Sequence, residues 1–254
     1  MPDLRKKAQQ FRSLHIAGRP LILFNAWDAG SARAVASGGA QAIATGSWSV
    51  AAANGYPDGE AVPFDLVLGN LARIATAVEL PVSVDLERGY GAHADAVGKS
   101  VAQVIRAGAI GCNIEDSLAQ AGQLRDVGEQ AERIRSARAA AAATLPDFFI
   151  NARTDLFLGS DPATHAKLVD EAIARASAYA LAGADGLFVP GLTDEGLISQ
   201  IVAACSLPLN IMVGDSTPAA ARLSQLGVAR ISHGPRPFLG MMKMLEAAAR
   251  EAIG

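Results

Sequence analysis

The chain has 254 residues, of which 50% are hydrophobic and 19% are charged, and its net charge is −3. This composition is typical of a globular chain with a large buried core, and it excludes a disordered or fibrous protein. No run of Lys and Arg interleaved with aromatic residues is present, which argues against nucleic acid as a partner. Two cysteines cannot build a disulfide framework, and no apolar stretch approaches the ~18 residues that would cross a membrane. We therefore expect a cytoplasmic protein with no membrane partner and no signal segment.

Short apolar strands alternate with Ala-rich amphipathic stretches along the whole chain. The predicted strands cover 21–25, 42–45, 82–85, 111–115, 148–152, 186–189, 209–213 and 228–232. The predicted helices include 64–78, 94–107, 129–143, 164–182, 194–204, 218–226 and 237–253. Eight strand–helix pairs in 254 residues predict an α/β fold, a single (β/α)8 TIM-type barrel with 1–254 as one domain. A doubly wound sheet fits less well, since no Gly-x-Gly-x-x-Gly follows the first strand.

Four helices are expected to end at a glycine that is followed by the next strand. These positions are Gly39, Gly108, Gly183 and Gly227, each followed by Ala or Val. Repeated glycine at this place predicts a left-handed cap at the end of each helix.

Acidic residues end two successive predicted strands. Asp85 and Glu87 close the third strand, and Glu115 and Asp116 close the fourth. Parallel strand ends meet at one rim of a barrel, and converging carboxylates are the ligands that Mg²⁺ prefers. A simpler alternative is that the acids cap the helices that follow. The pattern favours a metal site holding Mg²⁺, with Mn²⁺ as a possible substitute.

Further polar residues follow other strands and are expected at the same rim. In the loop 45–49, small residues around Gly46 and Ser47 could turn backbone N–H groups toward an anion, although an ordinary turn explains them too. Arg153 could bind a substrate carboxylate, or form a salt bridge to the neighbouring acids, or both. His233 could move a proton, but a lone histidine is more often structural.

The segments 24–32, 45–47, 55–58, 85–91, 114–116 and 151–155 together resemble the isocitrate lyase/phosphoenolpyruvate mutase superfamily, in order and over nearly the whole chain. The resemblance implies a barrel that binds Mg²⁺ and an α-keto acid or enolate, and that makes or breaks C–C or P–C bonds beside a pyruvate-like unit. It also implies helix-exchanged dimers paired into tetramers.

The same resemblance assigns roles to individual residues. Asp85 corresponds to the direct metal ligand, with Glu87 and Glu115 acting largely through water and Asp58 orienting this shell. By the same correspondence, Thr45, Gly46 and Ser47 hold the keto-acid carboxylate and oxyanion, Arg153 binds substrate and Asn210 is a polar residue of the seventh strand.

Departures from the family pattern limit the reactions and substrates that we expect. Lyases of this superfamily that cleave isocitrate or 2-methylisocitrate carry a Lys-Lys-Cys-Gly-His loop, whereas 117–124 contains no Cys, Lys or His. The Lys and Asn of the phosphonate branch are missing too, Gly191 stands where the lyases have Glu, and Glu87 stands where Asp is usual. We therefore expect a Mg²⁺-dependent carbon–carbon lyase acting on a small 2-oxo or 2-hydroxy dicarboxylic acid through an enolpyruvate-type intermediate. The alternatives are a phosphonopyruvate-type mutase or hydrolase and a non-catalytic keto-acid binder.

Overall fold

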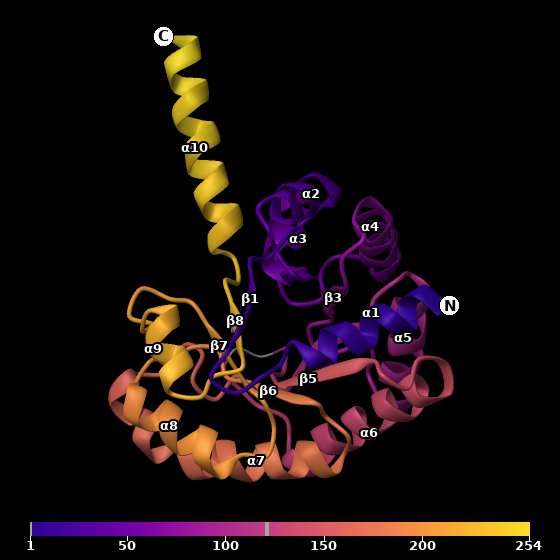
Figure 1. Ribbon diagram of the computed structural model, residues 1–254, viewed down its shortest axis with the longest axis vertical. Helices are drawn as coiled ribbons and strands as arrows, with labels where there is room; N and C mark the ends of the chain where they lie inside the picture. Colours follow the sequence, from indigo (N-terminus) through magenta and orange to yellow (C-terminus); the bar gives the residue numbers. More distant parts are fainter. Residues whose placement is uncertain (1, 120–121) are drawn as a thin grey trace.

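The computed structural model describes residues 2–119 and 122–254, and its parallel strands form a barrel surrounded by helices (Figure 1). The strands are β1 Leu21–Leu23, β2 Ile43–Ala44, β3 Val82–Asp85, β4 Gly111–Glu115, β5 Phe149–Arg153, β6 Gly186–Phe188, β7 Leu209–Met212 and β8 Arg230–Ser232. The helices are α1 Pro2–Ser13, α2 Ala29–Ser37, α3 Ser47–Ala53, α4 Phe64–Ala77, α5 Ala94–Arg106, α6 Val127–Thr144, the 3₁₀ helix η1 Pro162–Lys167, α7 Val169–Leu181, α8 Glu195–Ala204, α9 Ala220–Gln225 and α10 Arg236–Ile253. The predicted (β/α)8 barrel is confirmed.

Neighbouring strands pair in the order β1-β8-β7-β6-β5-β4-β3-β2, all in parallel. The seam between β1 and β2 is closed just beyond the strands, by a parallel bridge between Ala26 and Thr45. There the Ala26 N–H donates to the Ala44 carbonyl at 2.9 Å and the Gly46 N–H donates to the Ala26 carbonyl at 3.3 Å. The rim at the carboxyl ends of the strands is thus held together by backbone bonds on every side.

Most predicted elements agree with the structure to within a few residues. The strands 82–85 and 111–115 have the predicted bounds, whereas the helix expected over 164–182 is divided into η1 and α7. The loop expected over 45–49 is instead helical from Ser47, where the short helix α3 begins. Gly39, Gly108, Gly183 and Gly227 all have φ between 88° and 106°, which confirms the left-handed caps.

The helix α1 closes the amino-terminal end of the barrel. Its Phe11 is fully buried and its ring meets that of Phe149 edge-on, with centroids 5.5 Å apart. The opposite, carboxyl-terminal end is therefore the open rim, where barrel enzymes place their sites.

The last helix, α10, projects away from the barrel (Figure 1). Only its first turn is buried, where Pro237 and Phe238 lie against the rim and the rings of Trp27 and Trp48 pack around Phe238 at 5.1 and 6.0 Å. Beyond this first turn, α10 does not pack against its own barrel, which is the ordinary position of an eighth helix. Within the described ranges, no helix is both long enough and apolar enough to cross a membrane.

Candidate metal and keto-acid site

The predicted acids lie together at the ends of β3 and β4. Asp85 is in register with Asn113, and the pairing continues beyond the strand because the Glu115 N–H donates to the Glu87 carbonyl at 2.9 Å. This backbone bond brings two successive acidic strand ends to one place. These acids do not cap the helices that follow them, because α5 has His93 at its N-cap without a side-chain cap and the N-terminus of α6 is capped by Asp126.

Asp85 carries a carboxylate oxygen with no protein partner. Its Oδ2 accepts the Ser47 N–H at 3.1 Å, while its Oδ1 is buried and has no hydrogen-bond partner. The strand tip is fixed by Thr45, whose hydroxyl accepts the Asp85 N–H at 2.9 Å. A buried carboxylate oxygen without a donor is costly unless a cation or water meets it.

The other two carboxylates already have partners within the protein. Glu87 accepts the Tyr90 hydroxyl at 2.8 Å and the Glu60 N–H, and Glu115 accepts the Ser117 hydroxyl at 2.6 Å and Arg153 Nη1 at 2.8 Å. Tyr90 and Ser117 were not among the predicted site residues. The signal for both was their position, three and two residues after an acid at a strand end.

The electrostatics show an excess of negative charge at this rim. Burial raises the pKa of Glu87 to about 7, and the charges of Asp85 and Asp58 add to this effect. Burial likewise raises the pKa of Glu115 to about 7, opposed by Arg153 and reinforced by Asp155 and Asp85. Desolvation and then the Asp85 charge raise the pKa of Asp58. Each carboxylate would therefore be more easily ionised beside a cation.

Strained backbone lies in the segment after β3 and in the earlier loop that is hydrogen-bonded to it. Glu87, Tyr90 and Glu60 adopt φ values of 50°, 48° and 62°, a left-handed region that such residues rarely enter. Gly89, with φ 101°, lies between the first two, and an added Cβ there would come within 2.9 Å of Val97. Strain of this kind is commonly stored at functional sites, where it fixes side chains in one orientation.

Arg153 forms salt bridges to neighbouring acids, which was the expected alternative to binding a substrate carboxylate. Its Nε and Nη2 donate to both oxygens of Asp155 at 2.6 and 3.0 Å, and Nη1 donates to Glu115. Burial disfavours the guanidinium, but the Glu115, Asp155 and Asp85 charges outweigh it and raise the pKa of Arg153. Three of its five N–H groups are engaged in this way, which leaves two for a ligand carboxylate.

A fully buried acid, Asp116, binds the backbone of Asp155, the residue that holds this arginine. Its Oδ1 accepts the Asp155 N–H at 3.0 Å, and its Oδ2 accepts the Tyr179 hydroxyl at 2.8 Å and Arg175 Nη1 at 3.1 Å. Arg175 and Tyr179 come from α7, far along the chain. Their spacing of four residues puts them on one helix face, but nothing in the sequence identifies Asp116 as their partner.

The loop predicted to hold an oxyanion does not present free backbone donors. The Gly46 N–H donates to Ala26 and the Ser47 N–H donates to Asp85, so both are engaged within the protein. In this structure these groups close the barrel and hold Asp85, and an oxyanion role for them stays a prediction.

Two other predicted residues lie away from the carboxylates. The ring of His233 packs on Phe24, with centroids 4.9 Å apart, and Phe24 lines a groove outside the barrel. The His233 N–H donates to Asn25, which ties β8 to the β1–β2 seam. Asn210 is buried inside the barrel, where its oxygen accepts Asn151 and Ser232. The geometry favours a structural role for all of these side chains.

The residues fit a hydrated Mg²⁺ better than a fully protein-ligated ion. Among the residues that the structure describes, no three His, Cys, Asp or Glu side chains converge closely enough to ligate one ion directly. A single open carboxylate oxygen on Asp85, with hydrogen-bonded Glu87 and Glu115 nearby, suits a cation that keeps several waters. Asp85 would hold the ion directly, and the two glutamates would meet its waters.

Comparison with known proteins identifies the family. The family model for phosphoenolpyruvate phosphomutase matches residues 11–253, so the chain belongs to this family and to the isocitrate lyase/phosphoenolpyruvate mutase superfamily.

Both sequence relatives and solved structures support this assignment. The chain is 34% identical to 2-methylisocitrate lyase of Escherichia coli (97% of this chain, 83% of the relative) and 31% identical to oxaloacetate decarboxylase of Pseudomonas savastanoi (98% and 84%). The structure of a proposed phosphonomutase from Burkholderia cenocepacia J2315 superposes with a TM-score of 0.95 at 55% identity (98% and 99%). That of phosphonopyruvate hydrolase with oxalate and Mg²⁺ gives 0.82 at 25% (98% and 88%). The relatives thus include carbon–carbon lyases and an enzyme crystallised with Mg²⁺.

Proposed function

We propose that the protein is a Mg²⁺-dependent carbon–carbon lyase of small 2-oxo dicarboxylic acids, with decarboxylation of an oxaloacetate-type acid as its reaction. The observation that carries the proposal is the buried, unpartnered Oδ1 of Asp85 within a group of carboxylates. The relatives named as oxaloacetate decarboxylase and the oxalate–Mg²⁺ complex support it.

Each part of the site has a task in this reaction. When bound, Mg²⁺ would supply Lewis-acid polarisation of the 2-oxo group. Asp85 holds the ion, and Arg153 offers its two remaining N–H groups to a substrate carboxylate while Asp155 fixes the guanidinium plane. Asp116 in turn fixes the Asp155 backbone.

Loss of CO₂ fits this site better than cleavage that needs a dedicated acid. The segment 117–124 has no thiol, ammonium or imidazole, and the Ser117 hydroxyl already donates to Glu115. An antiparallel bridge joins Ser117 to Leu124, and Gln120 and Ala121 lie outside the described residues. Departure of CO₂ leaves its electron pair on the substrate and requires no proton for the leaving group. Cleavage of 2-methylisocitrate should be slow, since general acid catalysis is typically worth ~10²–10⁴-fold.

Turnover of oxaloacetate, 2-methylisocitrate and phosphonopyruvate with Mg²⁺ tests the proposal. We expect oxaloacetate decarboxylation that EDTA abolishes and that Asp85→Ala removes. Calorimetry with oxalate gives a second readout, because Mg²⁺-dependent binding should also vanish in Asp85→Ala. Equal oxalate affinity in EDTA would refute the metal assignment. Phosphonopyruvate turnover would support the phosphonate alternative, and Mg²⁺-dependent oxalate binding without turnover would support a non-catalytic binder.

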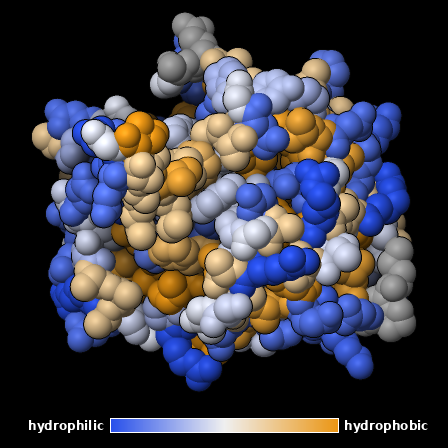
Figure 2. Space-filling view, turned by 90° about the horizontal axis from the view of Figure 1, so that it is seen from above, coloured by the Kyte–Doolittle hydropathy of each residue, from blue (hydrophilic) through white to orange (hydrophobic). Residues whose placement is uncertain are grey.

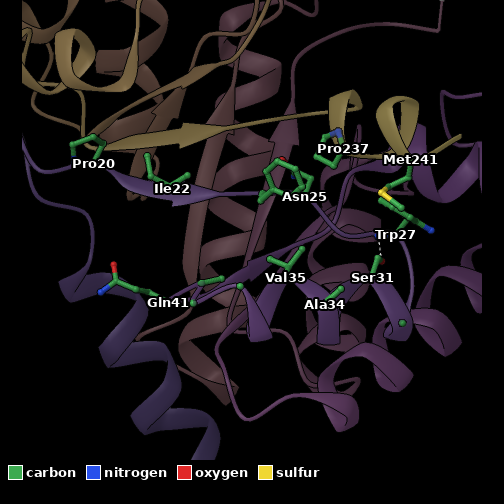
Figure 3. Close-up of a pocket in the computed structure, with 15 residues that line it drawn as sticks. Pro20, Ile22, Asn25, Trp27, Ser31, Ala34, Val35, Gln41, Pro237 and Met241 are labelled. Carbon is green, nitrogen blue, oxygen red and sulfur yellow. Dashed lines mark hydrogen bonds between the residues drawn. The ribbon is translucent and has the colours of Figure 1, made fainter. Parts of the chain in front are cut away.

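We also propose that the protein forms a homo-oligomer through α10. A groove of about 830 Å³ lies over β1, between α2 and the base of α10, and Ile22, Val35 and Met241 line it (Figure 3). Hydrophobic side chains show as orange patches on the surface seen from above (Figure 2), and exposed apolar residues of α10 include Met244 and Leu245. An eighth helix normally covers this flank of a barrel. The α10 helix of a second copy is the occupant that fits this groove, because its exposed apolar residues would cover the flank that an eighth helix covers in other barrels.

Light scattering tests this assembly. The parent chain should be a dimer or larger, and Ile22→Asp together with Met244→Asp should yield a monomer, since both changes put charge into the apolar contact. Arg250→Asp, on the exposed end of α10, is the matched control and should leave the mass unchanged. A monomeric parent would contradict the proposal.

A further inference from the structure

An arginine lies inside the barrel, beneath the acidic rim. Arg230, at the start of β8, is 1% exposed, although barrel interiors are usually filled by branched apolar side chains. Burying a cation costs free energy unless a carboxylate or several hydrogen bonds compensate it. The contacts of Arg230 are therefore informative.

These contacts leave the charge largely uncompensated. Nη2 donates to Asn113 Oδ1 at 3.2 Å, and the guanidinium carbon lies 5.9 Å from the centroid of the Phe11 ring below. Nε and Nη1 are buried without partners, and no described carboxylate lies within salt-bridge distance of Arg230. Burial lowers the pKa of Arg230 to about 9, opposed first by the Asp85 charge, so the group stays a cation at neutral pH.

A layer of amides separates this cation from the carboxylates. Asn151 donates to Asn113 at 2.9 Å and to Asn210 at 3.1 Å, both inside the barrel. Asn113 is in register with Asp85 on the neighbouring strand. Charges acting through such a dry, hydrogen-bonded interior are screened much less than charges at a surface.

We propose that Arg230 is a positioning residue. Its buried charge weakens binding of the divalent cation alone and strengthens binding of the cation together with an anionic ligand. Its positive field opposes Mg²⁺ at Asp85 and attracts the negative substrate, so the site binds metal firmly only when the keto acid is present. This inference rests on the proposed function and specifies how the same site couples its two ligands.

Neutral substitution at Arg230 separates this role from simple packing. Arg230→Met keeps most of the length without charge, Arg230→Gln keeps a donor for Asn113, and Arg230→Lys keeps the charge. Calorimetry measures Mg²⁺ alone and then oxalate at saturating Mg²⁺, with circular dichroism and thermal melting as checks of folding. Arg138→Met, whose parent side chain binds Asp185 rather than the amide layer, is the matched control.

The expected result is a pair of changes with opposite signs. Arg230→Met and Arg230→Gln should bind Mg²⁺ alone on the order of 3–10-fold more tightly and oxalate on the order of 3–10-fold more weakly. Arg230→Lys should restore both affinities toward the parent, and Arg138→Met should change neither. Weakening of both ligands, or no change in either by a folded neutral variant, would overturn the inference. If Arg230→Met does not fold, Arg230→Gln decides. Failure of the parent to bind oxalate with Mg²⁺ would instead refute the proposed function.

Discussion

The substitution Glu87→Gln measures how much the free energy of unfolding of the metal-free protein is lowered by an ionised carboxylate at the acidic rim. Burial raises the pKa of Glu87 from 4.5 to about 7, and the side chain is 5% exposed. A folded-state pKa above the unfolded value stabilises the protein fully below about pH 4.5, and this contribution is lost as the pH rises through about 7. At about 1.4 kcal/mol per pKa unit, ionisation of Glu87 lowers the free energy of unfolding by about 2.5 kcal/mol between pH 5 and pH 8.

Glutamine cannot ionise and therefore removes this dependence. One of the two acceptors used by Tyr90 and Glu60 becomes an amide nitrogen, which costs about 1 kcal/mol at every pH. The stability of Glu87→Gln relative to the parent should thus rise by about 2.5 kcal/mol from pH 5 to pH 8. At pH 8 the variant should be about 2 kcal/mol more stable than the parent.

Urea unfolding in EDTA at pH 5, 6, 7 and 8 gives the two stabilities. Glu251→Gln, at the exposed end of α10, is the control and should follow the parent at each pH. A difference between Glu87→Gln and the parent that stays constant with pH would refute the reasoning. Added Mg²⁺ at pH 8 should stabilise the parent more than the variant, because the cation offsets the charge that the variant lacks.

Three further substitutions test other parts of the site. Arg153→Lys should weaken Mg²⁺-dependent oxalate binding by about 1–3 kcal/mol in calorimetry, because an ammonium cannot reproduce the planar fork; unchanged affinity would make the arginine structural. Tyr179→Phe removes a donor from Asp116 and should lower the free energy of unfolding by about 1 kcal/mol while weakening oxalate less than Arg153→Lys does; a larger loss of oxalate affinity than in Arg153→Lys would contradict this order. Cys112→Ser should leave oxaloacetate turnover unchanged, since this thiol is fully buried in the core; efficient 2-methylisocitrate cleavage that this substitution abolished would overturn the substrate assignment.

The strands and the acidic rim could be predicted because local rules determine them. Apolar runs with a glycine before them mark strands such as β4, and parallel strands must present their final residues at one rim. The acids that end β3 and β4 therefore had to be neighbours wherever the helices lay. The order of motifs along the chain made the family recognisable for the same reason.

The remaining features depend on contacts between distant segments. The direction of α10 is set by the single turn that Phe238 anchors, and its apolar pattern predicts burial without saying against what. The pairing of Asp116 with Arg175 joins residues 59 apart in sequence. Backbone groups at Gly46 and Ser47 were expected to be free because a sequence shows the turn residues but not the acceptors opposite them.

Charge at the rim explains why metal and ligand should depend on each other. Burial is the main cause of the raised pKa values of Glu87 and Glu115, and the charge of Asp85 raises both further, so these carboxylates are unfavourable as anions without a cation. Arg153 is committed to Glu115 and Asp155, and Arg230 acts only through the amide layer, so neither can neutralise Asp85 directly. A divalent cation compensates the negative charge of the carboxylates but is repelled by the positive charge of Arg230. An anionic ligand is attracted by Arg230 and so compensates this repulsion. The two ligands together leave the smallest uncompensated charge in the barrel, which is the physical reason to expect their binding to be cooperative.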